Sequence, residues 1–175
     1  MLSLLSNVVY YTTQLIQVII FIVGCYFFSI SIFGWIKQKE TDAKSYAPQK
    51  KFALIIAAHN EEKVIGHVIE SLNKQNYPKE LYDIYVIADN CTDNTAQIAA
   101  NHGALVYTRV NNELRGKGYA LEWMFSKIFS MQKEYDAVSV FDADNLVSSN
   151  YLMEMNAKLC EGHKVIQGYI DSKNP

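Results

Sequence analysis

The first 36 residues contain no charged side chain, and this feature constrains the fold more than any other part of the sequence. The core of the stretch reads QLIQVIIFIVGCYFFSISIFGWI. About 22 helical residues span roughly 33 Å, which is enough to cross the hydrocarbon core of a bilayer. A core helix of a soluble domain fits less well because the stretch is apolar all round. A signal peptide would have a basic region before a shorter apolar part. The sequence therefore predicts one transmembrane helix within residues 1–36.

Basic residues predict the orientation of this helix. No basic residue precedes it, and the lysines that follow are Lys37, Lys39, Lys44, Lys50 and Lys51. The positive-inside rule then places the rest of the chain in the cytoplasm and the N-terminus outside, in a single-pass protein of the cell membrane. Residues 37–50 are polar and are expected to form a linker.

Composition excludes several classes of protein. The formal net charge is −2, without the basic bias of proteins that bind duplex nucleic acid. The three cysteines, Cys25, Cys91 and Cys160, lie far apart and have no metal-ligand spacing, so reduced thiols are expected. The sequence contains no Gly-x-Ser-x-Gly, no Walker-type loop and no Cys-x-x-Cys, which argues against the corresponding hydrolases, P-loop enzymes and zinc ribbons.

Beyond the linker, short apolar runs alternate with segments of helical periodicity. The expected strands cover residues 51–58, 82–88, 104–108, 137–141 and 164–170. The expected helices cover residues 61–75, 91–103, 119–129 and 148–162. Asn60 is a candidate N-cap for the first of these helices, Thr92 or Asp93 for the second, and Gly103 is expected to end the second. The alternation predicts an α/β domain over residues 51–175, with a mostly parallel sheet and helices on both faces.

Polar segments follow four of the expected strands. They read HNEE, DNCTD, RVNNELRGKG and DADN. Ligands of open parallel sheets bind at the carboxyl ends of the strands. We therefore expect these segments to meet at one edge of the sheet and to form a ligand site.

Asp142 and Asp144 are the first candidates for chemistry. Residues two apart on an extended chain point the same way, with Cα atoms roughly 6.5 Å apart, so their carboxylates repel unless a cation compensates. Oxygen ligands suit Mg²⁺ or Mn²⁺, and substrate phosphates often complete the coordination of such an ion. The Asp-x-Asp pattern by itself also fits a solvated turn or a helix cap. Its position at the end of a buried strand favours the metal site over these alternatives.

Three further residues at strand ends are candidates for a ligand pocket. Asp89 can accept a hydrogen bond from a base N–H or a ribose hydroxyl, or it can form an Asx-type turn. Glu61 can serve the dipole of the following helix or reach a bound nucleoside. His59 ends the first strand and is a candidate for the same pocket.

Lys117 lies between Gly116 and Gly118. The glycines allow close approach of the backbone to a ligand, and the lysine can neutralise a phosphate. The alternative is a mobile basic loop without a ligand. Arg115 lies in the same segment, and the same two interpretations apply to it.

The ordered set of these motifs resembles a family 2 glycosyltransferase with the GT-A fold, a Rossmann-like sheet, of the membrane-anchored, synthase-like kind. The resemblance covers about residues 51–175. It rests on the segments AAHNEE (57–62), ADNCTDNT (88–95), RGKGYAL (115–121), FDADN (141–145) and VIQGY (165–169).

The resemblance implies a nucleotide-sugar donor, UDP-sugar above all, and transfer of a hexosyl or N-acetylhexosaminyl group to a glycan or lipid-linked acceptor. It places Glu61 near the nucleoside, Lys117 near the diphosphate, and Asp142 and Asp144 on Mg²⁺ or Mn²⁺. Asp89 matches a base- or ribose-binding aspartate. Ala88 replaces a second aspartate that the family often has there. Gln167 is implied on the donor-sugar side of the pocket, together with Tyr169.

The resemblance also implies inversion by direct attack of an acceptor hydroxyl, with a carboxylate base that lies well beyond the Asp-x-Asp in such enzymes. No Glu-Asp or Gln-x-x-Arg-Trp pattern follows Asp144, and we therefore expect this chain to be the donor-binding half of a larger enzyme. The alternative is a membrane-anchored protein that binds a nucleotide sugar or a partner synthase without turnover. A nucleotidyltransferase fits less well, because no loop rich in glycine and arginine follows the first strand.

Overall fold

The computed structural model describes residues 2–35 and 46–170, which belong to two units that we describe separately. The first unit contains helix α1, Leu2–Trp35. Its segment Ser6–Ile32 is long and apolar enough to cross a membrane, with a mean hydropathy of 2.4 and no buried residue. Residues 36–45, with Lys37, Lys39, Lys44 and most of the expected linker, lie outside the described residues.

Several threonine and serine hydroxyl groups of α1 bond to carbonyls within the helix. Thr12 and Thr13 donate hydrogen bonds to the carbonyls of Val8 and Val9, at 2.9 and 2.7 Å. Ser29 donates in the same way to the carbonyl of Cys25, at 2.8 Å. The free energy of transfer into an apolar environment is less unfavourable for a polar group that is hydrogen-bonded within its own helix than for an unpaired one. The polar side chains of α1 are therefore compatible with a membrane span.

The second unit, residues 46–170, is built on a parallel sheet of four strands in the order β3-β2-β1-β4. The strands are β1 (Phe52–Ala58), β2 (Tyr82–Asp89), β3 (Leu105–Arg109) and β4 (Ala137–Asp142). All three pairings are parallel, so the carboxyl ends of the strands meet at one edge of the sheet. The predicted α/β class and the four expected strands up to residue 142 are confirmed, with boundaries shifted by one residue.

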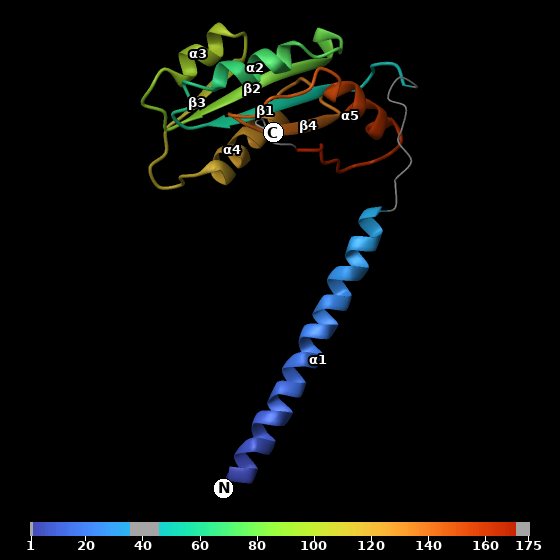
Figure 1. The fold of residues 1–175 in the computed structure, drawn as a ribbon. Helices are drawn as coiled ribbons and strands as arrows, with labels where there is room; N and C mark the ends of the chain where they lie inside the picture. The colour runs from blue at the N-terminus through green and yellow to red at the C-terminus, as the bar shows by residue number, and fades with distance from the viewer. Residues whose placement is uncertain (1, 36–45, 171–175) are drawn as a thin grey trace. The chain divides into compact units, whose positions relative to one another are not determined.

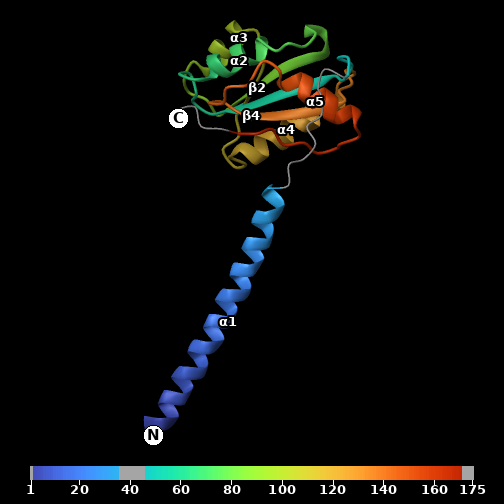
Figure 2. The same cartoon turned by 45° about the vertical axis from the view of Figure 1, so that its right-hand side comes forward.

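Helices cover both faces of this sheet. In Figures 1 and 2, α2 (Ile65–Asn73) and α3 (Thr95–Asn101) lie on one side and α4 (Lys117–Ser130) on the other. Helix α5 (Tyr151–Cys160) packs against the same core as α2. A short 3-10 helix, η2 (Lys79–Leu81), leads into β2.

The alternation of side chains along β1 explains these two layers. Phe52, Leu54 and Ile56 join the core beneath α2, while Ala53 and Ile55 join a second cluster with α4. A strand that is buried on both faces reads as a continuous apolar run, as FALIIAA does.

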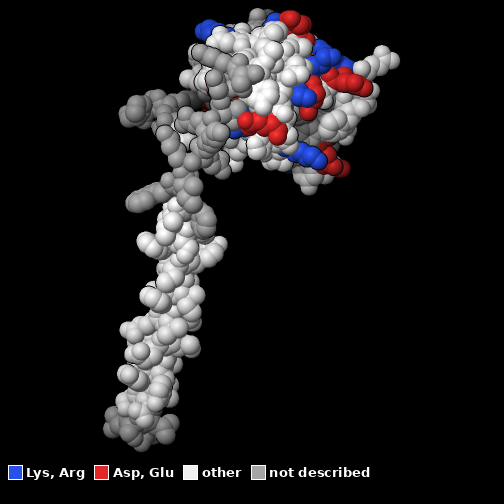
Figure 3. Space-filling view, turned by 90° about the vertical axis from the view of Figure 1, so that its right-hand side faces the viewer, with Lys and Arg blue, Asp and Glu red and all other residues white. Residues whose placement is uncertain are grey.

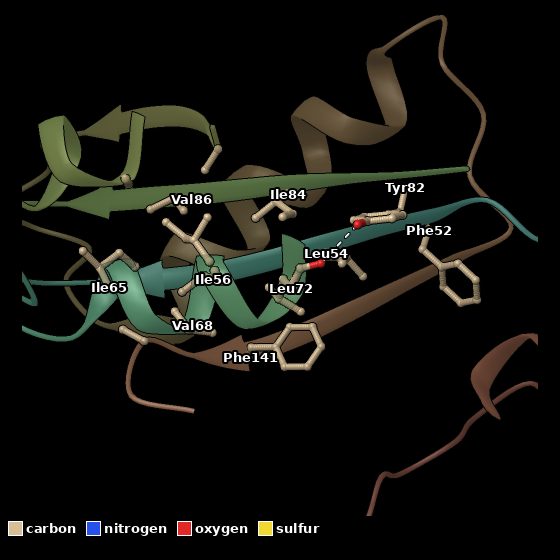
Figure 4. Close-up of a cluster of buried hydrophobic side chains, with 14 of the residues drawn as sticks. Phe52, Leu54, Ile56, Ile65, Val68, Leu72, Tyr82, Ile84, Val86 and Phe141 are labelled. Carbon is tan, nitrogen blue, oxygen red and sulfur yellow. Dashed lines mark hydrogen bonds between the residues drawn. The ribbon is translucent and has the colours of Figure 1, made fainter. Parts of the chain in front are cut away.

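The larger cluster also contains side chains from α2 and β2. Val68 and Leu72 of α2 are fully buried, and Val86 of β2 lies beside them (Figure 4). The hydroxyl of Tyr82 donates a hydrogen bond to the carbonyl of Leu72 at 3.1 Å, which fixes the end of α2 to the start of β2. The core therefore extends along the whole length of β1, from Phe52 to Ala58.

The predicted helix over residues 61–75 and its N-cap are wrong in part. Helix α2 begins at Ile65, after turns in which the N–H groups of Val64 and Ile65 donate to the carbonyl of Glu61. Asn60 is not the N-cap, because its φ is 57° and its side-chain oxygen accepts a hydrogen bond from the N–H of Thr92 at 2.8 Å.

For α3 the predicted start is wrong and the predicted end is right: the helix begins at Thr95 with Asn94 as its N-cap, not Thr92 or Asp93. The carboxylate of Asp93 accepts a hydrogen bond at 3.0 Å from the N–H of Thr95, the first residue of the helix. Gly103 follows α3 with a φ of 86°, a left-handed conformation that glycine adopts without strain. The expected helix end at Gly103 is confirmed.

The predicted strand over residues 164–170 is wrong. The segment is irregular, and Val165, Tyr169 and Ile170 are 93%, 91% and 79% exposed. A strand exists only where another strand pairs with it, and within the described residues this segment pairs with none. An apolar β-branched run is therefore not sufficient evidence for a strand.

Charged side chains of both signs are mixed on the face of the α/β unit that Figure 3 shows. The described part of α1 has none. This distribution agrees with the near-neutral net charge of −2. On this face the charges form no extended patch of one sign.

Candidate functional site

A cavity of about 280 Å³ lies where the carboxyl ends of β1 and β2 meet the start of α4. Its lining residues are Ala57, Ala58, His59, Asp89, Asn90, Arg115, Gly116, Lys117 and Ala120. The small side chains come from β1 and α4, and the polar ones come from the strand ends and the loop before α4. The structure thus brings together His59, Asp89 and Lys117, three of the residues that the sequence predicted.

A second hollow, of about 320 Å³, lies between α2 and the segment after β4. It is lined by His67, Glu70, Ser71, Lys74, Leu146, Val147 and Ser149. None of the predicted site residues lines it. Because Asp89 and Lys117 line the other cavity and Asp142 contacts Lys117, we assign the candidate site there.

The ends of β1 and β2 are tied to each other. The Nδ1 atom of His59 lies 2.7 Å from the carbonyl oxygen of Asp89. Asn60 and Asn90 follow the two strands with φ values of 57° and 51°, and asparagine is among the few residues that tolerate this region. His59 and Asn90, one from each of the two turns after these strands, line the cavity.

Asp89 is almost completely buried, with 7% exposure, and pairs with a residue that the sequence analysis missed. The Nη1 atom of Arg109 donates to its Oδ1 at 2.6 Å, and the amide of Asn90 donates to the same oxygen at 3.1 Å. Arg109 is itself only 5% exposed. The signal that could have found it is an arginine that ends the apolar third strand, beside a strand that ends in aspartate.

Lys117 connects the cavity to β4. It is the first residue of α4, it follows Gly116 with a φ of 111°, and its Nζ contacts the Oδ1 atom of Asp142. Both side chains are about half exposed, at 48% and 61%. Asp142 pairs with Ala57 in the sheet register, so the carboxylate lies beside the tip of β1. The end of β4 therefore belongs to the same edge as the cavity.

The residues at the end of β4 fit a divalent cation. Asp142 and Asp144 are exposed carboxylates, and Asp142 already holds a cationic group, the ammonium of Lys117. Among the residues that the structure describes, no group of three or more His, Cys, Asp or Glu side chains is placed to hold a metal. The protein would supply two carboxylates, and a diphosphate and water would complete the coordination of Mg²⁺ or Mn²⁺.

Four predicted residues lie outside the lining of the cavity: Asp142, which contacts Lys117, and Asp144, Glu61 and Gln167. Glu61 is half-buried, and its N–H donates to the hydroxyl of Thr95 at 2.8 Å. Gln167 is exposed in the irregular segment after α5. The structure does not bring either side chain to the other site residues.

Two titratable groups near the rim have shifted pKa values. Burial raises the pKa of the Cys91 thiol. At Asp93, partial desolvation would raise the pKa, but hydrogen bonds from the side chain and backbone of Thr95 and from the N–H of Glu62 outweigh it and lower the pKa. The Asp93 carboxylate thus binds the loops after β1 and β2 together.

Comparison with known proteins agrees with this architecture. A family model described as Glycosyl transferase family 2 matches residues 53–175. A beta-monoglucosyldiacylglycerol synthase of Synechocystis sp. is 32% identical over 117 residues, which are 64% of this chain and 23% of that protein. Protein RfbJ of Shigella flexneri is 36% identical over 103 residues, which are 59% of this chain and 71% of that protein. The chain spans less than a quarter of the length of the synthase.

A solved structure is similar over the same region. Residues 1–349 of Staphylococcus aureus TarS, in complex with UDP-GlcNAc, superimpose with a TM-score of 0.50 and 27% identity. The match covers 63% of this chain and 31% of the TarS chain.

Proposed function

This chain belongs to glycosyl transferase family 2, and from that membership we propose that it binds the nucleoside diphosphate of a sugar donor, UDP-sugar above all, for transfer of the sugar to an acceptor hydroxyl. The observation that carries the proposal is the gathering of His59, Asp89 and Lys117 around one cavity, with Asp142 in contact with Lys117. Cationic and anionic groups then lie within reach of one ligand, as a diphosphate with its metal requires.

The proposal gives each residue a role. Asp89 accepts a hydrogen bond from the base or ribose, with His59 beside it. Lys117 binds the diphosphate, and Asp142 and Asp144 hold Mg²⁺ or Mn²⁺. That ion, when bound, neutralises charge on the leaving diphosphate. The complex of TarS with UDP-GlcNAc supports the choice of UDP, because that protein shares the fold at 27% identity. Glu61 is proposed to lie near the nucleoside and Gln167 on the side of the donor sugar, although neither lines the cavity.

Charge determines the chemistry in this proposal. Breakage of the bond between sugar and phosphate leaves negative charge on the diphosphate, and Lys117 stabilises that charge as a preplaced cation. Attack of the acceptor hydroxyl on the opposite face inverts the anomeric centre, and a carboxylate base takes its proton. None of the residues above is assigned as that base, so the proposal gives this chain the donor-binding part of the reaction, with a glycan or lipid-linked acceptor.

Helix α1 is proposed to anchor the enzyme in the cell membrane, with the α/β unit in the cytoplasm. The support is the uncharged segment Ser6–Ile32 with a mean hydropathy of 2.4, and the lysines that follow it in sequence. A membrane anchor would suit an acceptor linked to a lipid.

A binding experiment tests the proposal. The full chain, purified in detergent, is titrated with UDP in the presence of Mn²⁺ and in the presence of EDTA. We expect binding to need Mn²⁺ and to weaken on the order of tenfold or more in Asp144→Asn, since charged contacts to phosphate and metal each contribute about 1.5–3 kcal/mol. Glu134→Gln, at an exposed acidic residue before β4, is the matched control and should bind as the wild type.

Binding of UDP that is indifferent to Mn²⁺ and to Asp144→Asn would contradict the metal assignment, and no binding of UDP would contradict the proposal as a whole. Release of UDP from a UDP-sugar in the presence of acceptor membranes distinguishes a transferase from a protein that only binds the donor.

A further inference from the structure

Arg109 makes two charged hydrogen bonds from a buried position at the end of β3. Its Nη1 atom donates to Asp89 Oδ1 and its Nη2 atom donates to the carbonyl of Leu114, both at 2.6 Å. The side chain is 5% exposed. Asp89 and Arg109 are direct neighbours in the parallel register of β2 and β3. One guanidinium thus bridges the carboxylate that lines the cavity and the loop that leads to Lys117.

A buried guanidinium is costly unless it is paired and hydrogen-bonded. The carboxylate of Asp89 compensates the charge, but charge compensation alone does not require the second bond to Leu114. That bond uses the fork of arginine, which presents donors in two directions, and a lysine ammonium cannot reproduce the arrangement. The geometry therefore indicates a second role for Arg109 besides neutralisation of the Asp89 carboxylate, which is to hold the backbone at Leu114.

The loop between β3 and α4 has few apolar contacts to hold it. Val110 is 83% exposed and Leu114 is 47% exposed. The loop is fixed by polar groups instead: the N–H of Asn111 donates to Asn90 Oδ1 at 2.8 Å, and the N–H of Leu114 donates to Asn111 Oδ1 at 2.8 Å. Arg109 adds the one charged bond to this loop backbone among the residues that the structure describes.

We infer that Arg109 is a positioning residue of the donor site, which sets the Asp89 carboxylate and the loop before Lys117 in their binding positions at the same time. The inference rests on the proposed function. Arg109 does not line the cavity and acts through Asp89 on one side and through the backbone of Leu114 on the other. The base-side and phosphate-side ends of the cavity are then set by one side chain, before any ligand binds.

The substitution Arg109→Lys separates this role from simple neutralisation, because lysine keeps a positive charge beside Asp89 but loses the fork. Hydrogen exchange of the backbone amides in residues 110–116 is measured by mass spectrometry on the full chain in detergent, without ligand. We expect exchange on the order of tenfold faster in Arg109→Lys, which corresponds to the loss of one charged hydrogen bond. Under Mn²⁺, we expect UDP to bind on the order of tenfold more weakly.

Tyr135→Phe is the matched control for general destabilisation. Its hydroxyl belongs to a polar group with Tyr85 and Asp83 that is remote from the cavity. Its loss should lower the melting temperature without a change in exchange of residues 110–116 or in the dissociation constant of UDP.

Unchanged loop exchange and unchanged UDP binding in a folded Arg109→Lys variant would overturn the inference. If the wild type itself does not bind UDP, the proposed function fails, and the exchange data still decide whether Arg109 orders the loop. If Arg109→Lys does not fold, the double variant Asp89→Asn with Arg109→Gln removes both buried charges together, which is less disruptive than removal of one. Normal protection of residues 110–116 in that variant would also overturn the inference.

Discussion

Two pairs of opposite charge define the candidate site at the scale of single residues. The pair of Asp89 with Arg109 is buried, and the pair of Lys117 with Asp142 is about half exposed. A buried pair that is broken leaves an uncompensated charge, whereas an exposed pair can exchange partners at small cost. We therefore expect the first pair to stay fixed during ligand binding and the second to separate.

The exposed pair predicts a competition between Lys117 and a metal ion for Asp142. In Lys117→Met, Mn²⁺ should bind up to about fivefold more tightly without nucleotide, because an exposed ion pair contributes at most about 1 kcal/mol. The same variant should bind UDP more weakly in the presence of Mn²⁺. Isothermal titration of the full chain with Mn²⁺, and then with UDP, measures both effects.

Lys133→Met is the control, because Lys133 also contacts an aspartate, Asp83, in the first half of β2. It should change neither affinity. Equal Mn²⁺ affinity in the wild type and in Lys117→Met would show that the lysine does not compete for the metal site.

Asp93 predicts a dependence of stability on pH. Its pKa is lowered in the folded state, so its contribution is present above the ordinary carboxyl pKa and is lost as the pH falls through the folded-state value. Asp93→Asn should therefore lower the melting temperature at pH 7, and the difference from the wild type should shrink as the pH falls below about 4. A difference that stays constant down to the acid transition would contradict this account.

At the scale of elements, α5 is tied to the segment before β1 through one buried side chain. Asn156 is fully buried, and its Oδ1 accepts hydrogen bonds from the N–H groups of Gln49 and Lys50, at 3.2 Å each, and from the hydroxyl of Tyr77 at 3.1 Å. Its Nδ2 donates to the carbonyl of Ala47 at 3.1 Å. This contact holds together elements that are more than a hundred residues apart in sequence.

Asn156→Ala should lower the free energy of unfolding by about 2 kcal/mol, because it leaves buried donors without their acceptor. Chemical denaturation followed by tryptophan fluorescence measures the change. Asn150→Ala, at the N-cap of the same helix, is the matched control, because Asn150 is exposed and makes no side-chain capping bond. Equal loss of stability in both variants would show that burial of Asn156 has no special effect.

At the scale of the whole molecule, an apolar helix and an α/β unit with mixed surface charge are joined in one chain. Side chains as apolar as Phe21 and Ile22 are 72% and 61% exposed on α1. An exposed apolar surface of this length requires a cover of lipid or protein. The membrane is the proposed cover.

The double substitution of Phe21→Lys and Ile22→Lys tests the membrane anchor. Each lysine near the centre of a span costs about 2.5–3.5 kcal/mol on insertion scales, so the variant should move from the membrane fraction to the alkaline extract. Substitution of the same two residues by leucine is the control and should stay in the membrane. A wild-type chain that alkali extracts completely would contradict the anchor.

Much of this protein followed from its sequence. Apolar periodicity predicted five strands, of which the structure has the first four, because a buried strand and an amphipathic helix have different local repeats. Parallel connections then placed the polar segments after the strands at one edge, and His59, Asp89 and Lys117 line one cavity there. The uncharged first segment predicted α1 for the same local reason.

Contacts between distant residues were decided only by the tertiary structure. Residues 164–170 had the composition of a strand but no strand beside them, because pairing depends on an edge elsewhere in the chain. Arg109 lies 20 residues from Asp89 in sequence, and only the register of β2 against β3 makes them neighbours. The sequence by itself determined four of the strands, the helices between them approximately, and the edge where polar residues gather. Only packing decided which charges meet, since register and burial are properties of the assembled sheet.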